Sequence, residues 1–380
     1  MNKWTDRIYV WGFISLLGVL CVFFLVSPKK AFSEMENRYL QKAPELSWES
    51  IKSKKFSDEA ELYVTDHFPL RSNWTAAKSV LEQIRLQKEN NGIYLGEDGY
   101  LFEKSVKPDF STVEKYAEAV NKFAANHPDS DISFLLAPNS VGVYPNLLPW
   151  LAIAYPQKDI NEFIAARAGD ELTFLNGFDF LKPDGERPLY YRTDHHWTSY
   201  GAYLAYRAFA ESKGWEPLDE EQFQIRTVTD SFLGSYHTRG QFVAVKPDSI
   251  QKYEPKQPVK TEMHILDNGK TVEGLYDESF LAKKDKYSYF QGGVHAVVKV
   301  SSDLKPEDTD LSKLLVIKDS YAHSVLPFLT NHVQEIHMID IRYYNGNISD
   351  YMEQNGIKDA LLLFNTSTFV QERSLLKLKY

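Results

Sequence analysis

The chain is poor in cysteine and in positive charge. Its 380 residues contain one cysteine, Cys21, which lies in an apolar N-terminal run. The rest of the chain therefore has no thiol for a disulfide, a zinc–thiolate site or a cysteine nucleophile. Acidic residues outnumber Lys and Arg by 52 to 43, which makes the net charge −9. This deficit of positive charge argues against nonspecific binding to nucleic acid, because such binding needs cations to neutralise phosphates.

Apolar residues are abundant. Hydrophobic residues make up 43% of the chain and aromatic residues 14%, which is enough apolar surface to offset the chain entropy of a folded core. The length predicts two domains, or one large domain with an insertion.

An uncharged run lies near the N-terminus, from Ile8 to Val26. At about 1.5 Å per residue, such a run spans a bilayer core of about 30 Å. Basic residues flank it on both sides, so the charge bias that sets orientation is weak. We expect an uncleaved single-pass anchor through residues 8–26, with residues 31–380 outside the cytoplasm. A cleaved signal peptide and a buried core helix are the alternatives.

Two parts of the chain alternate between helical and strand-like patterns. In the first part we expect strands at 132–137 and 172–175, with helices that begin at the Ser111 capping box, at Ile160 and at Thr198 or Ser199. In the second part we expect three apolar strands, at 314–317, 336–341 and 360–364, separated by helices near 322–331 and 348–354. This alternation predicts an α/β fold, with a parallel sheet that carries helices on both faces.

The regions between and before these parts look different. Residues 231–310 contain turn pairs and strand-like runs, which predict a β-rich insertion. Residues 31–110 form a polar lead-in with a helix near 57–68 and a short hairpin around 93–95. The predicted organisation is an anchor with a cytoplasmic tip (1–30), a lead-in (31–110), the first part of the α/β domain (111–230), the insertion (231–310) and its second part (311–380).

Polar residues follow the predicted strands, where open parallel sheets bind their ligands. Ser320 lies between the strand 314–317, from which Lys318 and Asp319 separate it, and the start of a helix. Its hydroxyl could therefore act as a nucleophile and its amide could stabilise an oxyanion. Asn365 follows the strand 360–364 and could provide a second oxyanion donor. Arg342 follows the strand 336–341.

A second polar run precedes the helix near Thr198. Asp194 lies two residues before His196, a spacing that lets a carboxylate orient the imidazole. Asp194, His196 and Ser320 could then act as orienting acid, base and nucleophile. The other interpretations are a helix N-cap at Asp319-Ser320, a surface or packing histidine pair, and a metal site formed by Asp194, His195 and His196.

The run Asp194-His195-His196-Trp197 resembles the signature of the bacterial DHHW protein family. That family is related to the alginate O-acetyltransferases AlgJ and AlgX, whose catalytic domains are SGNH-hydrolase-like. Supporting runs are Glu36-Asn37-Arg38, Asp66 to Arg71 and Tyr94 to Phe102, so the resemblance covers most of residues 33–380.

The resemblance implies roles for particular residues. Asp194 and His196 match the triad acid and base, and Ser320 matches the nucleophile of a Gly-Asp-Ser pattern in which Lys318 replaces the glycine. The order Asp, His, Ser implies a circularly permuted SGNH-like domain. In that order Asn365 matches the oxyanion asparagine, Gly346 or its neighbours match the glycine block, and Arg342 matches an arginine that lines the active site.

The resemblance also implies a function. We expect a membrane-anchored, extracytoplasmic O-acetyltransferase that uses a serine to acetylate a surface or exported polysaccharide. The acetyl donor would come through a membrane acyltransferase partner, and no cofactor is expected. A carbohydrate acetylesterase with the same site, and a non-catalytic glycan-binding factor of the cell envelope, are the alternatives.

Overall fold

The computed structural model describes residues 3–33, 38–305, 307 and 309–380. Glu36 and Asn37, from the first supporting run, lie outside these residues. The chain divides into two compact units, Met1–Gln87 with Gln241–Val243 and Lys88–Gly240 with Ala244–Tyr380.

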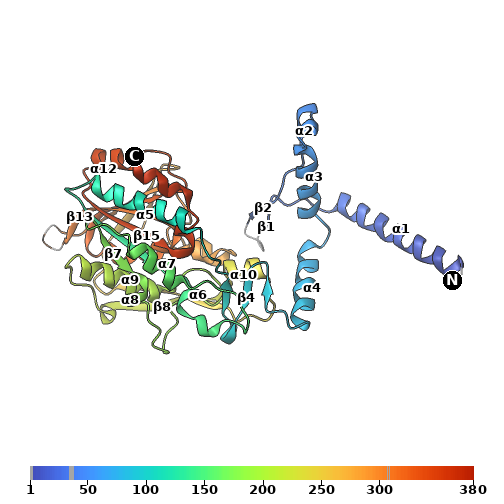
Figure 1. Ribbon diagram of the computed structural model, residues 1–380, viewed down its shortest axis with the longest axis horizontal. Helices are drawn as coiled ribbons and strands as arrows, with labels where there is room; N and C mark the ends of the chain where they lie inside the picture. Colours follow the sequence, from blue (N-terminus) through green and yellow to red (C-terminus); the bar gives the residue numbers. More distant parts are fainter. Residues whose placement is uncertain (1–2, 34–37, 306, 308) are drawn as a thin grey trace. The chain divides into compact units, whose positions relative to one another are not determined.

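The first unit contains short elements and one long apolar helix (Figure 1). Its elements are α1 (Lys3–Val26), β1 (Phe32–Ser33), β2 (Arg38–Tyr39), α2 (Trp48–Lys52), α3 (Lys55–Asp66) and α4 (Arg71–Ile84). Within α1, residues 4–26 are long and apolar enough to cross a membrane, and no other helix in the described part of the chain is. The predicted span at 8–26 lies inside this helix.

The second unit is an α/β structure with the central sheet and most of the helices. Its strands are β3 (Glu89–Asn90), β4 (Ile93–Leu95), β5 (Leu101–Glu103), β6 (Asp131–Ala137), β7 (Thr173–Asn176), β8 (Phe223–Phe232), β9 (Asp248–Pro255), β10 (Thr261–Ile265), β11 (Lys270–Glu273), β12 (Val297–Ser302), β13 (Leu311–Lys318), β14 (Val333–Asp340) and β15 (Asp359–Asn365). Its α-helices are α5 (Phe110–Ala125), α6 (Ser140–Val143), α7 (Gln157–Ala165), α8 (Gly177–Phe180), α9 (Ser199–Ser212), α10 (Ser235–Gly240), α11 (Leu326–Leu329), α12 (Ile348–Asn355) and α13 (Thr366–Phe369).

The central sheet has eight strands in the order β11-β10-β12-β14-β13-β15-β6-β7. The five strands from β14 to β7 are parallel, as expected, but β12, β10 and β11 are antiparallel. The sheet is therefore mixed. The parallel strands place the ends of β13, β14, β15 and β6 at one edge, and this edge positions the candidate site.

Helices cover both faces of the sheet, because its central strands are apolar on both sides. In β13, Leu314 and Val316 pack with one core and Leu315 and Ile317 with the other. The first core includes α9, and the second includes α5, α7 and α12. Figure 1 shows α5 and α12 on the opposite side of the sheet from α9.

Most predicted elements are present, with two corrections in the helices. The helix α5 begins at Phe110 and its N-cap is Asp109, which accepts a hydrogen bond from the Ser111 backbone N–H, so the predicted Ser111 capping box is wrong. The helix expected near 322–331 is two short pieces, the 3₁₀ helix η7 (Ser320–Ser324) and α11, where Pro327 lies within the first turn of the second piece.

The β-rich character of residues 231–310 is confirmed, but most of the strands do not form a separate layer. The strands β10, β11 and β12 extend the central sheet, and β9 pairs with β8 in a two-stranded ribbon. Because β12 pairs directly with β14, this segment is integral to the sheet and cannot be removed without exposing the edge of β14.

The central strands predict a large difference between two leucine truncations. Leu362 of β15 is fully buried, whereas Leu376 near the C-terminus is partly exposed. Leu362→Ala should lower the free energy of unfolding by about 2–5 kcal/mol, because it leaves a cavity between the sheet and its helices. Denaturant unfolding of the full chain in detergent, followed by near-UV circular dichroism, measures this change. Leu376→Ala is the matched control, and an equal loss in both variants would contradict the assignment of this core.

Candidate active site

Ser320 lies at the turn after the central strand β13. Asp319 caps the short helix η7 by accepting a hydrogen bond from the Tyr321 N–H at 2.8 Å, and Ser320 is the first residue of that helix. Its hydroxyl is partly exposed. A backbone N–H at the first position of a helix has no partner within the helix, so the Ser320 amide can donate to an anion that forms at the hydroxyl.

Asp194 and His196 lie in a loop that precedes α9. A bridge between Tyr190 and Trp197 closes the loop, and the Tyr191 N–H donates to the His196 carbonyl at 3.2 Å. The indole N–H of the buried Trp197 donates to the Ser324 hydroxyl at 2.9 Å and to the Tyr321 carbonyl at 3.1 Å. The tryptophan of the DHHW run therefore ties this loop to the helix that carries Ser320.

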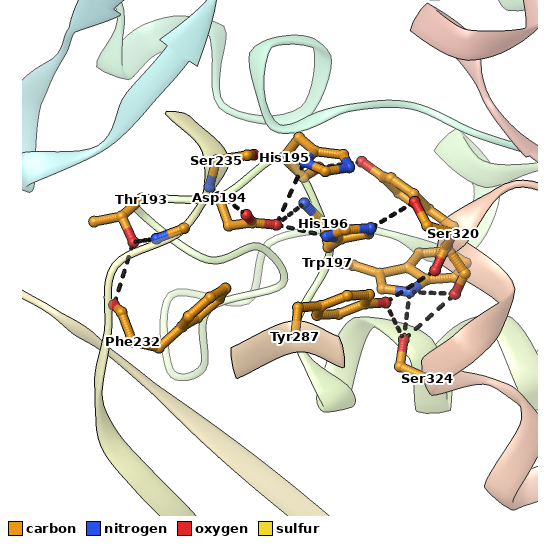
Figure 2. A network of polar contacts seen from close by, with 12 residues as sticks. Thr193, Asp194, His195, His196, Trp197, Phe232, Ser235, Tyr287, Ser320 and Ser324 are labelled. Atoms are coloured by element: carbon orange, nitrogen blue, oxygen red, sulfur yellow. Dashed lines mark hydrogen bonds and ion pairs between the residues drawn. The ribbon is translucent and has the colours of Figure 1, made fainter. Parts of the chain in front are cut away.

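The three side chains form one hydrogen-bonded chain (Figure 2). The His196 Nε2 atom lies 2.7 Å from the Ser320 hydroxyl, and its Nδ1 atom lies 2.6 Å from Asp194 Oδ1. This arrangement is the one that lets an imidazole take the proton of a serine while a carboxylate holds the ring in the required tautomer. The structure thus brings Ser320 together with the pair Asp194 and His196, although His196 and Ser320 lie 124 positions apart along the chain.

The Asp194 carboxylate is buried and well supported. Its Oδ1 also accepts from the His196 N–H at 2.9 Å, and its Oδ2 accepts from the Ser235 N–H at 2.6 Å. Burial opposes its negative charge, but His195, His196 and these hydrogen bonds outweigh that effect and hold its pKa well below the usual value. The carboxylate is therefore ionised over the physiological pH range.

The backbone at Gly234 lies close to the Asp194 carboxylate, because glycine has no side chain. A side-chain Cβ atom at Gly234 would lie 2.3 Å from Asp194 Oδ2, so no other residue fits there without displacing the carboxylate. Sequence reasoning did not identify Gly234, because it follows β8 and gives no signal of its contact with Asp194.

Asp248 supports the same loop from β9. Its carboxylate accepts hydrogen bonds from the backbone N–H groups of Arg192 and Thr193, both at 2.9 Å, and from the Thr193 hydroxyl at 2.6 Å. Burial raises the pKa of Asp248, although these hydrogen bonds act in the opposite direction. Sequence analysis missed this residue, because a lone aspartate at a strand start has no distinguishing pattern.

His195 bonds to Ser235 and not to the serine of the triad. Its Nδ1 atom lies 2.6 Å from the Ser235 hydroxyl and 3.5 Å from Asp194 Oδ1. Its ring lies beside that of His196 (Figure 2), with centroids 3.7 Å apart and planes tilted by 39°. Burial and the neighbouring His196 lower the pKa of His195 to about 4, against the opposing effect of Asp194. His195 is therefore neutral at pH 7.

A metal ion could be reached by the side chains of Asp194, His195 and His196, but it would compete with the hydrogen bonds that His196 already makes. Asp194, His195 and His196 each offer one ligand atom, and these atoms lie within 4.8 Å of one another. Both ring nitrogens of His196 already have partners, Asp194 and Ser320. A cation would have to replace one of these contacts, so the geometry favours the proton-transfer arrangement.

Tyr287 contacts both the base and the nucleophile. Its ring is stacked on His196, with centroids 3.5 Å apart and planes 9° apart. Its hydroxyl donates to the Ser320 carbonyl at 3.2 Å and lies 3.1 Å from the Ser324 hydroxyl. It comes from the 3₁₀ helix η5 (Lys286–Tyr289), within the segment that sequence analysis treated as an insertion. The sequence has 23 tyrosines, and nothing in the pattern around Tyr287 distinguishes it from the others.

Asn365 lies beside the serine turn but holds other groups. Its amide nitrogen donates to Asp319 Oδ2 at 2.7 Å and to the Thr368 hydroxyl at 2.8 Å, so both amide hydrogens have partners. Its backbone N–H also donates to Asp319 Oδ2, at 2.8 Å. In this arrangement Asn365 fixes the residue that precedes Ser320, and the predicted role as a second oxyanion donor would require the amide to exchange one of these contacts.

Arg342 lies at the end of β14, the strand next to that of Ser320. Its guanidinium makes a two-pronged contact with the buried Asp340, at 2.8 Å and 2.7 Å. Burial works against its charge, but this contact with Asp340 keeps the pKa of Arg342 above its usual value. The arginine is therefore a fixed, partly exposed cation at the same sheet edge, and among the described residues its guanidinium bonds to Asp340 and not to the triad.

Gly346 is not joined to this site. It lies in an exposed loop and lines a shallow groove with Arg373, Lys377 and Tyr380. A Cβ atom there would meet the Tyr344 ring and hydroxyl. Within the described part of the chain, the triad makes no hydrogen bond or ring contact with this groove, and the role of Gly346 as the glycine block stays a prediction.

The stacking of Tyr287 on His196 predicts that Tyr287→Leu and Tyr287→Phe will differ in the reactivity of Ser320. When His196 takes the Ser320 proton it becomes a cation, and an aromatic face stabilises a cation by about 0.5–2 kcal/mol. Tyr287→Leu should slow the reaction of Ser320 with phenylmethylsulfonyl fluoride about 10-fold, whereas Tyr287→Phe keeps the ring and should react at a rate within about threefold of the unmodified chain. Mass spectrometry of the labelled serine measures both rates. Equal losses in the two variants would assign the effect to the hydroxyl and contradict the stacking role.

Lys318 predicts a pH dependence of stability. It is buried, its ammonium lies 2.6 Å from His323 Nε2, and burial lowers its pKa to about 8 despite the opposing effect of Asp340. Between pH 8 and the usual lysine pKa of 10.5, the unfolded chain keeps this proton and the folded chain loses it. Stability relative to Lys318→Met should therefore rise with pH over that interval and be flat below it. Denaturant unfolding of both chains across the interval tests this, and a constant difference would contradict it.

Comparisons with known proteins agree with this architecture. The model of the DHHW protein family matches residues 173–339. A DHHW family protein from Eubacterium siraeum has 24% sequence identity, a TM-score of 0.66, and an alignment that covers 76% of this chain and 95% of that chain. PatB1 from Bacillus cereus has 18% identity and a TM-score of 0.64, with coverage of 76% and 99%; it has also been solved with a sulfonyl adduct.

A more distant match is the O-acetyltransferase domain of Pseudomonas putida AlgJ, with 16% identity, a TM-score of 0.47, and coverage of 76% of this chain and 98% of that domain. No curated protein matches the chain. The matched region contains Asp194, His196 and Ser320, and the fold is shared with solved structures over three quarters of the chain. The resemblance to the DHHW protein family is thus confirmed over residues 173–339.

Proposed function

We propose that this chain is a serine-dependent O-acetyltransferase that acetylates a cell-surface or exported polysaccharide. The second unit would lie outside the cytoplasm and would be tethered to the membrane through α1. The single observation that carries the catalytic part is the hydrogen-bonded chain from Asp194 through His196 to Ser320. The choice of acetyl as the group that is transferred rests on the resemblance described for Asp194, His196 and Ser320.

The first half-reaction acetylates the enzyme. His196 Nε2 takes the proton of Ser320 as the hydroxyl oxygen attacks the acetyl carbonyl of the donor. The ionised Asp194 stabilises the imidazolium that results. The bond between the acetyl group and the donor then breaks, the leaving group receives the proton from His196, and acetyl-Ser320 remains.

The second half-reaction reverses these roles. A sugar hydroxyl loses its proton to His196 and attacks acetyl-Ser320. The ester bond to Ser320 breaks, and the serine oxygen regains a proton from His196. The product is an acetylated sugar, and the enzyme returns to its starting state.

The oxyanion of each step needs donors at the serine turn. The Ser320 N–H is one, because of its position at the start of η7. Asn365 could serve as a second donor only if it exchanged one of its contacts with Asp319 and Thr368. Arg342 provides a positive charge at the neighbouring strand end, where it could favour a polar or anionic substrate group.

The membrane tether fits a donor that is delivered at the membrane. The helix α1 is long and apolar enough to span a bilayer. A partner in the same membrane could supply the acetyl group to Ser320, and the polysaccharide would be the acceptor. Transfer exceeds hydrolysis only when the site excludes water or binds the sugar well, and stacking of Tyr287 over His196 shields one face of the base.

Replacement of the serine tests the proposal. The purified full chain is incubated with 4-nitrophenyl acetate, with and without a mixture of acceptor oligosaccharides. We expect an acetyl group on Ser320 and sugar acetylation that depends on the acceptor, and we expect Ser320→Ala to lower turnover by about a thousandfold or more. Ser231→Ala, an exposed serine of the same unit, is the matched control.

Other results of this experiment would favour one of the alternative functions. Acetate release to water that does not respond to acceptors would assign the site to an acetylesterase. Full turnover by Ser320→Ala would contradict a catalytic serine altogether. Glycan binding that survives in that variant, with no turnover by the unmodified chain, would favour the non-catalytic envelope factor.

A further inference from the structure

The second unit carries an exposed apolar loop that the proposed reaction does not use. We name residues 148–154, between the 3₁₀ helix η2 (Pro145–Leu147) and α7, the tip loop. Its side chains Trp150, Leu151 and Ile153 are 91%, 76% and 70% exposed. Val106, on a neighbouring segment, is 62% exposed. Adjacent large apolar side chains with this degree of exposure usually mark an interaction surface.

The tip loop is held in place by hydrogen bonds. The Ile153 N–H donates to the Tyr94 hydroxyl at 3.2 Å, and that hydroxyl lies 3.4 Å from the Ile153 carbonyl. The Tyr155 N–H donates to the Ser105 carbonyl at 2.9 Å, and the Ser105 hydroxyl donates to the Tyr155 carbonyl at 2.9 Å. These contacts fix both the tip loop and the segment of Val106, so the apolar side chains are presented together.

The backbone of the loop is strained at one residue. Leu151 has a φ of +66°, in the left-handed region that glycine or asparagine usually occupies. A leucine is disfavoured in this region, because its Cβ atom comes too close to the following carbonyl oxygen. Leu151 therefore combines a disfavoured backbone conformation with a side chain that is 76% exposed.

The residues beside the tip loop fit a membrane surface. Lys104 and Lys107 flank Val106 and are exposed. Tryptophan, aliphatic side chains and lysines are the residues that anchor a protein at the boundary between lipid headgroups and acyl chains. The same chain contains α1, which is able to cross a bilayer, so a bilayer would be within the reach of this unit.

We propose that the tip loop inserts Trp150, Leu151 and Ile153 into the interfacial layer of the lipid bilayer. The loop follows β6, and β6 ends at the same edge of the sheet as the strand that carries Ser320. Insertion would therefore hold the active-site edge close to the membrane surface. This inference rests on the membrane tether of the proposed function and is independent of the chemistry at Ser320.

A fluorescence experiment on the full chain tests this insertion. Cys21 is the one native cysteine and lies in α1, so an environment-sensitive nitrobenzoxadiazole label on it reports on the anchor. On a Cys21→Ser background, Ile153→Cys carries the label in the tip loop while Trp150 and Leu151 remain. Asp129→Cys on the same background is the matched control, because Asp129 is exposed and precedes β6, at the opposite edge of the sheet from the tip loop.

The labelled chains are reconstituted into vesicles of equal parts phosphatidylcholine and phosphatidylglycerol, with and without spin-labelled lipids that quench at shallow or deep positions. We expect strong shallow quenching at position 153, deep quenching at Cys21 and little quenching at position 129. Adding Trp150→Asp to the Ile153→Cys chain should reduce the quenching at least severalfold.

The other possible results distinguish insertion of the tip loop from anchoring through α1. Quenching at Cys21 without quenching at position 153 would overturn the insertion and leave the anchor intact. A blue-shifted but unquenched label at position 153 would assign the patch to a protein partner or a second copy, which also overturns it. Absence of quenching at Cys21 would remove the anchor and this inference with it.

Discussion

The contact between the buried Asp194 carboxylate and the His196 imidazole is the interaction on which the candidate site depends. A carboxylate inside a protein is costly unless hydrogen bonds satisfy it. Asp194 meets this need with the Nδ1 atom and backbone N–H of His196 and with the backbone N–H of Ser235. The same contacts orient His196, so that Nε2 faces the Ser320 hydroxyl. The hydrogen bonds between Asp194 and His196 therefore both stabilise the buried carboxylate and align the base.

Some groups of the site are positioned by strands of the sheet and others by a loop. The parallel strands β13 and β15 place Ser320 and Asn365 at neighbouring strand ends, where Asn365 holds the Asp319 carboxylate. The loop with Asp194 and His196 has no such position in the sheet. Trp197 ties it to η7, and the carboxylate of Asp248 satisfies its backbone N–H groups.

The segment 231–310 has a different role from the one its composition suggested. It extends the central sheet through β12, and it completes the site through Tyr287, which lies against His196. Gly234 and Ser235, at its start, surround the Asp194 carboxylate. Because these contacts come from turns and short helices, they depend on the positions of the surrounding strands and not on local pattern.

The sequence by itself determined the α/β alternation, the apolar N-terminal helix and the residues Asp194, His196 and Ser320. Buried strands are continuous apolar runs, and a strand end followed by a polar turn is a local feature, so both can be read without coordinates. Only the tertiary structure decided that Asn365 holds Asp319, that Gly346 lies in another groove, and that Gly234, Asp248 and Tyr287 support the site. These contacts join residues far apart in the chain, and their geometry arises from packing, which no local spacing encodes.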